Sequence, residues 1–337
     1  MKQKKLYNVA VLGATGAVGQ EMIKVLAERK FPIGELRLLA SARSAGKAVR
    51  YEGREVVIQE AYDAAFEGMD IVLGAAENDI AKRFAPAIQA AGAVFVDNSS
   101  AFRLDPDVPL VVPEINAEDA YTQKKGIIAN PNCSTIITLM ALAPIARISS
   151  IETIVASTYQ AVSGAGANGL TELEAQAQAY PKGEPLTANA FPHQILFNLL
   201  PRIGGIGENG YSSEEMKLQN EGRKILHLPA LRVTCTCVRV PVMRSHSISA
   251  TFTTKRPVSV EEARAAIAAA EGVQLVDNPN NDVYPMPLDT SDQDDVFVGR
   301  IRRDLVSENG LTLWCCGDQI RKGAATNAVQ IAELLVK

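Results

Sequence analysis

Short apolar runs alternate with amphipathic segments between residues 7 and 130 of the chain. Each apolar run is long enough for one buried strand, and each amphipathic segment gathers its apolar residues on one face of a helix. This alternation predicts an α/β fold with a doubly wound parallel sheet of the Rossmann type. The expected strands are YNVAVLG (7–13), ELRLLA (35–40), IVLGA (71–75) and AVFVDNS (93–99), and the expected helices are QEMIKVLAERK (20–30) and AKRFAPAIQAAG (81–92). VRYEGREVVIQ (49–59) breaks the rhythm and predicts a hairpin that turns at EGRE.

The pattern changes near residue 131. Three long alternating runs follow, at 151–164, 231–240 and 247–257. Long alternating strands with helices between them predict a mostly antiparallel or mixed sheet with one covered face, and therefore a second domain of the α+β class. The segment 181–210 is rich in Pro, Gly and Asn. It predicts loops at the surface or at a subunit contact.

The last helix, expected over 322–337, carries an apolar stripe through Ala328, Ile331 and Leu334 with Leu335. Such a stripe needs a partner surface, and we expect the helix to pack back on the first domain. The first domain is then discontinuous, with residues 1–131 and 319–337. The second domain then covers 132–318.

Composition narrows the function classes. A length of 337 residues fits two domains, and 47% hydrophobic with 21% charged residues is ordinary for a globular protein. The net charge of −4 argues against a nucleic-acid partner. No run approaches the roughly 18 apolar residues of a membrane span, so we expect a cytoplasmic protein with a small-molecule substrate.

Five cysteines occur, and an odd number argues against a closed disulfide framework. Their spacings match no zinc pattern, so no metal is expected. Cys235 and Cys237 share one face of a predicted strand, and Cys315 and Cys316 are adjacent in another. These four are interpreted as small core residues. Cys133 differs, because it lies in the polar turn NPNCST.

A glycine-rich turn joins the first strand to the first helix. Gly13, Gly16 and Gly19 let a phosphate approach backbone N–H groups at the helix N-terminus, where the dipole favours an anion. The alternative is a packing turn without a ligand. The second strand ends in LLASARSAGK, which lacks the carboxylate that usually holds the ribose of NAD. Ser41, Arg43 and Ser44 lie there instead, and they favour the 2′-phosphate of NADP over NAD.

Cys133 precedes an apolar helical run, STIITLMALAPIA. The positive end of a helix dipole favours a thiolate. The unbonded N–H groups of the first turn can also stabilise an oxyanion. Both effects suit attack on an aldehyde or an acyl phosphate, although a small structural residue in a turn remains the alternative.

Polar residues near the ends of the later strands supply the other candidates. Gln160 is a positioning group, and Ser163 with Gly164 forms a turn able to approach a cofactor. Arg239 and His246 flank a predicted strand–turn–strand, and His246 is the best base candidate among the three histidines. A structural histidine is the alternative reading of that residue.

The motifs GATGAVG, SSAFR, NPNCST, TYQAVSGAG, EEMK, VRVPV with RSHS, and GAATNAVQIAE together resemble the aspartate-semialdehyde dehydrogenase family. They occur in the same order over nearly the whole chain, and NPNCST with TYQAVSGAG is a specific combination. The resemblance implies an NADP-dependent enzyme that forms a homodimer or a higher homo-oligomer. It also implies that the first domain binds NADP and that the second domain, 132–318, serves catalysis and dimerisation. Ile248 departs from the pattern, because a polar or acidic residue is expected after RSHS.

The resemblance also implies a role for each site residue. Cys133 is the nucleophile that forms an acyl thioester, and His246 is the acid/base group. Gln160 orients the substrate, Arg239 binds its carboxylate and Glu214 its ammonium group. Arg103 and Lys217 bind phosphate. The cofactor contacts are Ser163, Gly164 and Gln319. The diphosphate of NADP lies at Thr15, Gly16, Ala17 and Val18.

The implied reaction is the NADPH-dependent conversion of L-4-aspartyl phosphate to L-aspartate 4-semialdehyde and inorganic phosphate. It belongs to the biosynthesis of lysine through diaminopimelate, and of methionine, threonine and isoleucine. An N-acetyl-glutamyl-phosphate reductase is a nearby alternative, but its substrate has no free ammonium group for Glu214. A non-catalytic NADP-binding redox sensor is a second alternative, which would not need Gln160, Arg239 and His246 together.

Overall fold

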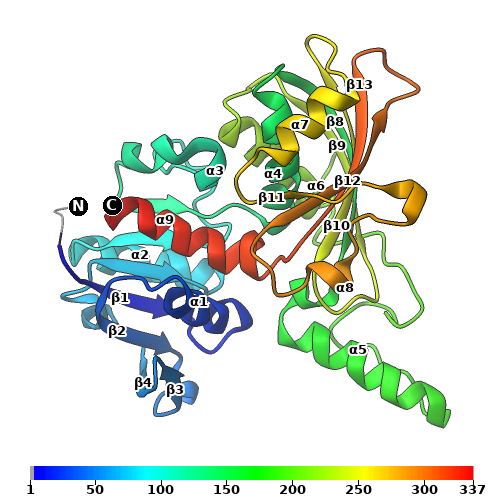
Figure 1. Ribbon diagram of the computed structural model, residues 1–337. Coiled ribbons are helices and arrows are strands. Elements are labelled where there is room, and N and C mark those ends of the chain that lie inside the picture. The colour runs from blue at the N-terminus through cyan, green and yellow to red at the C-terminus, as the bar shows by residue number, and fades with distance from the viewer. Residues whose placement is uncertain (1–3, 337) are drawn as a thin grey trace. The chain divides into compact units, whose positions relative to one another are not determined.

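The computed structural model describes residues 4–336, which form two compact units (Figure 1). Unit 1 contains the described residues through Asn132 and those from Ala324 onward, and unit 2 is Cys133–Gly323. Two boundaries differ from the expected ones. Asn132 lies in unit 1, and residues 319–323 lie in unit 2. The second difference has a physical reason, because the side chain of Gln319 bonds to groups of unit 2.

Unit 1 is built on a seven-stranded sheet. Its strands are β1 (Tyr7–Leu12), β2 (Ile33–Ala40), β3 (Ala48–Tyr51), β4 (Arg54–Glu60), β5 (Ile71–Gly74), β6 (Val94–Asp97) and β7 (Ile127–Ala129). The spatial order is β3-β4-β2-β1-β5-β6-β7, and every neighbouring pair is parallel except β3 and β4. The predicted doubly wound sheet and the predicted hairpin at EGRE are therefore confirmed.

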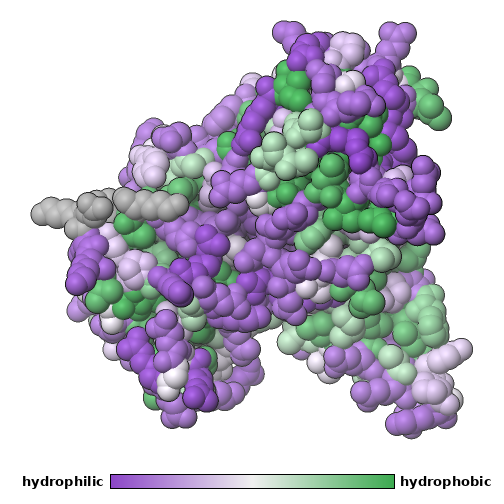
Figure 2. Space-filling view, in the orientation of Figure 1, coloured by the Kyte–Doolittle hydropathy of each residue, from purple (hydrophilic) through white to green (hydrophobic). Residues whose placement is uncertain are grey.

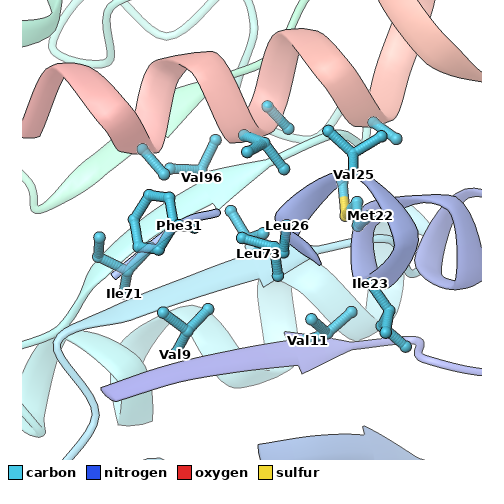
Figure 3. Packing of buried hydrophobic residues seen from close by; sticks show 14 of the residues in the cluster. Val9, Val11, Met22, Ile23, Val25, Leu26, Phe31, Ile71, Leu73 and Val96 are labelled. Atoms are coloured by element: carbon cyan, nitrogen blue, oxygen red, sulfur yellow. The ribbon is translucent and has the colours of Figure 1, made fainter. Parts of the chain in front are cut away.

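Helices supply the apolar faces that cover this sheet. They are α1 (Ala17–Glu28), α2 (Asn78–Ala90), the short α3 (Pro113–Asn116) and α9 (Thr326–Val336). Figure 3 shows Met22, Val25 and Leu26 of α1 meeting strand residues of β1, β5 and β6 beside α9, drawn in faint red. Arg29 Nε lies 2.7 Å from Glu333 Oε1, which joins the end of α1 to α9. The predicted apolar stripe on the last helix is buried in this cluster.

Unit 2 is built on a six-stranded mixed sheet in the order β11-β12-β13-β10-β8-β9. The strands are β8 (Ile151–Gln160), β9 (Arg232–Arg239), β10 (His246–Thr254), β11 (Val273–Leu275), β12 (Val296–Arg303) and β13 (Gly310–Gly317). Pairs β10–β8, β10–β13 and β12–β13 are antiparallel, whereas β8–β9 and β11–β12 are parallel. The sheet is mixed, as the long alternating runs predict.

One face of the unit 2 sheet is covered by helices. These are α4 (Cys133–Ala146), α6 (Ser213–Ile225) and α7 (Val260–Ala268); α5 (Ala167–Ala179) and α8 (Pro287–Thr290) lie elsewhere in the unit. Ile154, Ala250 and Phe252 are buried on the covered face, where Ile248 also lies, and an apolar side chain suits that position. Val155, which points the other way, is 55% exposed. The second face is therefore open in the single chain.

Apolar side chains reach the surface of unit 2. Figure 2 shows them, in green, over the part of the unit that carries β10, β12 and α8 in Figure 1. Val283, Met286 and Leu288 are among the exposed large apolar residues of this part of the chain. No helix within residues 4–336 is long and apolar enough to cross a lipid bilayer.

The first turn of α1 depends on a glycine. A Cβ atom at Gly19 would lie 2.2 Å from the carbonyl oxygen of Gly13, so the backbone of the turn would have to move. We expect Gly19→Ala to lower the free energy of unfolding by about 1–3 kcal/mol, as overpacking does. Urea unfolding followed by circular dichroism measures the change.

Gly222→Ala in α6 is the matched control. Its new Cβ would find the nearest atom, of the Leu231 side chain, at 3.5 Å. A helix-interior glycine with room for a methyl group should gain up to about 1 kcal/mol on conversion to alanine. Equal unfolding midpoints for the two variants would contradict the packing argument.

Candidate active site

Three predicted site residues lie at neighbouring strand ends of the unit 2 sheet. β8 ends at Gln160, which pairs in parallel register with Arg239 at the end of β9. β10 runs the opposite way and begins there, because Ser247 pairs with Tyr159. Gln160, Arg239 and His246 are all buried, with 2%, 6% and 0% exposure. Strand pairing thus brings together residues that are far apart in the sequence.

Cys133 is the first residue of α4, as the NPNCST turn predicts. Every residue from Ser134 to Ile145 is buried, so α4 is a central helix that is apolar on all sides. Cys133 itself is only partly buried. Its thiol therefore lies at the positive end of the helix dipole while staying within reach of a ligand, and both conditions favour a reactive thiolate.

Gly323 gives Cys133 its space. It belongs to a π-helical turn, Arg321–Ala325, and a Cβ atom there would lie 2.8 Å from Cβ of Cys133. Such turns are frequent at functional sites. No sequence pattern predicts this residue, because a close contact between residues 190 positions apart leaves no local signal beyond a glycine inside a predicted helix.

His246 is held by its Nδ1 atom, which accepts a hydrogen bond of 3.1 Å from the backbone N–H of Ala161. Nε2 is buried and has no hydrogen-bond partner among residues 4–336. Burial, and to a lesser extent the Arg239 guanidinium, lower the pKa of His246 to about 3, while the charge of Glu214 opposes the shift. The imidazole is therefore neutral near pH 7.

Arg239 lies close to His246 across Gly164. A Cβ atom at Gly164 would be 2.7 Å from Nη1 of Arg239 and 3.2 Å from Nε2 of His246. Nη1 also donates to the carbonyl oxygen of Ala161 at 2.8 Å. Burial lowers the pKa of Arg239, and the charges of Cys133 and Glu214 oppose this effect. A cation, a thiol and an imidazole thus share one partly desolvated region of unit 2.

Glu214 and Lys217 form an ion pair on α6, with Nζ 2.7 Å from Oε2. This is the contact that their spacing predicts. The second carboxylate oxygen of Glu214 accepts from Nε2 of Gln160 at 3.4 Å. Gln160 also donates to the Thr158 hydroxyl at 3.2 Å. The structure therefore connects Gln160, Glu214 and Lys217.

Gln319 joins two segments of unit 2. Its amide nitrogen donates to the hydroxyl of Ser163, and its amide oxygen accepts from the backbone N–H of Ser245 at 2.9 Å. The neighbouring Asp318 is fully buried and accepts from the backbone N–H groups of Ile320 and Arg321 at 2.9 and 3.0 Å. Asp318 thus fixes the turn that carries Gln319. The sequence analysis did not single it out, although it lies directly beside a predicted site residue.

In unit 1, the glycine loop has the shape that a diphosphate requires. Gly13 has φ +88°, and a Cβ atom there would lie 2.7 Å from the carbonyl oxygen of Ala75. Gly16 is the N-cap of α1, and no side chain in the described part of the chain caps that helix end. The first-turn N–H groups have no intrahelical partner. Together with Thr15, Ala17 and Val18, this loop fits an anionic dinucleotide.

The residues after β2 lie beside this loop in the sheet order, because β2 pairs with β1. Ser41 and Arg43 are exposed, and Ser44 is buried. Arg43 pairs with no carboxylate within the described ranges, so its guanidinium can donate hydrogen bonds to a phosphate. Of the three residues, Ser41 and Arg43 are therefore the better placed for a ligand.

Arg103, predicted to bind phosphate, is buried in unit 1. Its Nε donates to the carbonyl oxygen of Asn130 at 2.9 Å, and its Nη2 donates to that of Asn98 at 2.8 Å. The Asn130 side chain bonds in turn to Asn98 and Asn327. These contacts hold the chain that leads into NPNCST, which explains the arginine at position 103 and the asparagine at position 130. Phosphate binding by Arg103 stays a prediction.

Comparison with known proteins decides the family. The family model described as "Semialdehyde dehydrogenase, NAD binding domain" matches residues 8–123, and "Semialdehyde dehydrogenase, dimerisation domain" matches 142–322. The aspartate-semialdehyde dehydrogenase of Aquifex aeolicus is 52% identical over 334 residues, which cover 98% of each chain. The chain belongs to the aspartate-semialdehyde dehydrogenase family.

Solved structures agree with this family. The crystal structure of aspartate semialdehyde dehydrogenase II from Vibrio cholerae complexed with ASA has a TM-score of 0.96 and 44% identity, with 99% of each chain covered. The aspartate semialdehyde dehydrogenase with NADP from Candida albicans has a TM-score of 0.74 and 27% identity, with 98% of each chain covered. The predicted family, the fold class and the class of enzyme, an oxidoreductase acting on an aldehyde, are confirmed.

The buried His246 has a consequence for stability. Its pKa falls from the ordinary 6.5 to about 3 in the folded protein, so only the unfolded chain takes up this proton between those values. Stability must therefore fall as the pH drops below about 6.5. Between about pH 6.5 and pH 5, we expect the wild type to lose about 2 kcal/mol more than His246→Gln does.

Urea unfolding at several pH values measures this difference. Ser247→Ala is the matched control, because Ser247 is a buried neighbour on β10 that carries no titrating group. It should keep the wild-type dependence on pH. Parallel curves for the wild type and His246→Gln would mean that the imidazole takes up its proton in the folded state.

Proposed function

We propose that this chain catalyses the NADPH-dependent conversion of L-4-aspartyl phosphate to L-aspartate 4-semialdehyde and phosphate, a step of amino-acid biosynthesis, through a thioester on Cys133. The observation that carries the assignment of roles is the arrangement in unit 2. A partly exposed thiol begins the central helix, and Gln160, Arg239 and His246 lie at the ends of adjacent strands. The family to which the chain belongs supplies the reaction class.

Cys133 provides the nucleophile. Its thiolate attacks the acyl carbon, the acyl–oxygen bond breaks, and phosphate leaves with the bonding electrons. The nicotinamide, when bound, supplies a hydride to the acyl carbon. The carbon–sulfur bond then breaks, which regenerates the Cys133 thiolate and releases the aldehyde. A thioester suits this sequence because thiolate is a good leaving group in the last step.

Charged side chains of unit 2 fix the substrate. Arg239 presents a planar guanidinium that matches a carboxylate, and its burial strengthens the attraction. Glu214 holds the substrate ammonium, and its contact with Gln160 supports a shared role of the two residues in substrate binding. Lys217, paired with Glu214, binds phosphate. Arg103, a residue of unit 1, is also proposed to bind phosphate. The ammonium site on Glu214 favours a free amino acid over an N-acetylated substrate.

Unit 1 binds NADP in this proposal. The first turn of α1 holds the diphosphate at Thr15, Gly16, Ala17 and Val18, with Gly13 allowing the close approach. Ser41 and Arg43, with Ser44 behind them, hold the 2′-phosphate. Ser163, Gly164 and Gln319 of unit 2 contact the nicotinamide side, and the Gln319 side chain donates a hydrogen bond to the Ser163 hydroxyl. The NADP complex of the Candida albicans relative supports this choice of cofactor.

Unit 2 also forms the subunit contact of a homodimer or a higher homo-oligomer. The open face of its sheet supports this proposal, because Val155 is half exposed there and Tyr159 lies against Trp314. A matching family model is described as a dimerisation domain.

The proposed location of the protein is the cytoplasm. All five cysteines in the described chain are free thiols, which fits the reducing environment of that compartment.

A phosphate-dependent assay tests the proposed function. Purified protein is given aspartate semialdehyde, phosphate and NADP, and the formation of NADPH is followed by absorbance. We expect turnover that requires all three. Turnover with N-acetyl-glutamate semialdehyde and none with aspartate semialdehyde would reject the assignment.

Cys133→Ala tests the nucleophile. Loss of the thiol removes the covalent route, so kcat should fall by at least about 10⁴-fold. NADPH binding, measured by fluorescence titration, should stay within about threefold of the wild type. Cys235→Ala, a change at a buried cysteine of β9, is the control and should keep most of the activity. Activity that survives in Cys133→Ala would sink the thioester.

Arg43→Ala tests the cofactor preference. A lost charge-assisted contact to the 2′-phosphate should lower kcat/KM with NADP by about tenfold or more and leave kcat/KM with NAD nearly unchanged. Arg50→Ala is the control, because Arg50 is also an exposed arginine of unit 1. An unchanged ratio of the two kcat/KM values in Arg43→Ala would remove this residue from the site.

A further inference from the structure

Strand β9 lies at one end of the unit 2 sheet. Its outer edge pairs with no other strand of the described chain, apart from a single bridge between Arg239 and Leu200. The backbone N–H groups of such an edge need other partners. Helix α6 lies against β9 and supplies one, because Glu215 Oε1 accepts a hydrogen bond from the backbone N–H of Cys237 at 3.1 Å.

Two further residues of α6 extend this contact. Gln219 Oε1 accepts from the backbone N–H of Val233 at 3.2 Å, and Arg223 Nε donates to the carbonyl oxygen of Leu231 at 2.8 Å. Glu215, Gln219 and Arg223 are four residues apart, so their side chains lie on one face of the helix. Their backbone partners follow in the reverse order along the chain. The three contacts therefore fix both the position of α6 along β9 and its rotation about its own axis.

Glu215 makes a second contact, at the start of its own helix. Its Oε2 atom accepts from the backbone N–H of Ser212 at 2.7 Å, and the Ser212 hydroxyl accepts from the backbone N–H of Glu215 at 3.3 Å. This pair is the capping box of α6. The two oxygens of one carboxylate thus join the N-terminus of α6 to the backbone of β9 at Cys237.

This link lies between the two charged residues proposed to hold the substrate. Glu214 immediately precedes Glu215 on α6, and Arg239 lies two residues after Cys237 on β9. Glu214 also contacts Gln160, which pairs in register with Arg239. An α-amino acid carries its ammonium and its carboxylate on the same carbon atom. A site for both groups therefore needs its anion and its cation at one fixed spacing.

We propose that Glu215 is a positioning residue that sets the spacing between Glu214 and Arg239, and thereby the affinity for a free α-amino acid. This inference rests on the proposed function. Glu215 itself does not touch the substrate; it acts by holding the first turn of α6 against β9. A displacement of a binding group by about 1 Å can cost up to about a hundredfold in rate.

Glu215→Gln tests this role. The amide keeps the size of the side chain but has only one acceptor oxygen, so the bond to Ser212 or the bond to Cys237 is lost. The ammonium and the carboxylate do not react, so weaker binding of these groups raises KM and leaves kcat unchanged. We expect KM for aspartate semialdehyde to rise by about tenfold, with kcat and the KM for NADP within about threefold of the wild type. A wild-type KM would overturn the proposal.

Glu215→Asp is the second variant, which keeps the charge. Its side chain is shorter by one methylene group, so the carboxylate cannot reach from Ser212 to Cys237. The same rise in KM is expected, and it tests the proposal even if Glu215→Gln does not fold. Thermal unfolding shows which variants are folded before their kinetics are compared.

Arg223→Ala is the matched control. It removes the contact with Leu231 at the other end of α6, more than two helical turns from Glu214. The loss should lower the unfolding temperature but leave KM for aspartate semialdehyde within about twofold of the wild type. A tenfold rise in KM in this variant would mean that any loosening of α6 weakens substrate binding, and would overturn a specific role for Glu215.

A double-mutant cycle with Glu214→Gln shows whether Glu215 acts through its neighbour. With the charge of Glu214 removed, the spacing no longer matters for the ammonium group. Adding Glu215→Gln should then raise KM by less than about twofold, because the two substitutions remove the same interaction. A further tenfold rise would show an independent effect and would contradict the proposal.

The outcomes for the inference and for the proposed function are distinguishable. A wild type without phosphate-dependent turnover of aspartate semialdehyde fails the proposed function, and the inference fails with it. A wild type that turns over, with a KM that Glu215→Gln and Glu215→Asp leave unchanged, fails only the inference.

Discussion

The pairing of β8 with both of its neighbours is the constraint on which the site in unit 2 depends. Parallel register places Gln160 beside Arg239, and antiparallel register places the start of β10 next to the end of β8. A slip by one residue would turn these side chains to the opposite face of the sheet. The same register buries Ile154 and Phe252 against the helices. The apolar core and the polar site are therefore fixed by one set of backbone hydrogen bonds.

Burial then determines what these side chains can do. Outside water, the charge of Arg239 acts strongly on its neighbours, so it favours the thiolate of Cys133 and disfavours an imidazolium at His246. The positive charge of Arg239 thus favours the anionic form of Cys133 and the neutral form of His246. The backbone N–H of Ala161 completes the arrangement by deciding which nitrogen of His246 carries the proton. In this account, the charge of Arg239 favours the thiolate before a substrate arrives.

Much of this was readable from the sequence, and the limits are physical. Periodicity predicts the strands and helices of both units, because burial on one face repeats at a fixed spacing. Motifs predict Cys133, Gln160, Arg239 and His246. Periodicity does not show that Gly323 approaches Cys133, nor that Ala161 bonds to His246, because these contacts join distant segments and involve backbone atoms.

The domain boundary shows the same limit. The expected first domain includes residues 319–323, yet Gln319 bonds to Ser163 and Ser245, and these residues belong to unit 2. Arg103 is a second case. Its motif predicts a phosphate site, and the structure shows that it also holds the carbonyl oxygens of Asn98 and Asn130. A motif identifies a residue, but it does not give all of its contacts.

Trapping the covalent intermediate tests the central claim, a thioester on Cys133, most directly. The protein is mixed with aspartate semialdehyde and NADP without phosphate, quenched in acid, and examined by intact-protein and peptide mass spectrometry. The account predicts one aspartyl adduct per chain, on the peptide that contains Cys133, together with one equivalent of NADPH. An adduct on another residue, or a full equivalent of NADPH with no adduct, would contradict it.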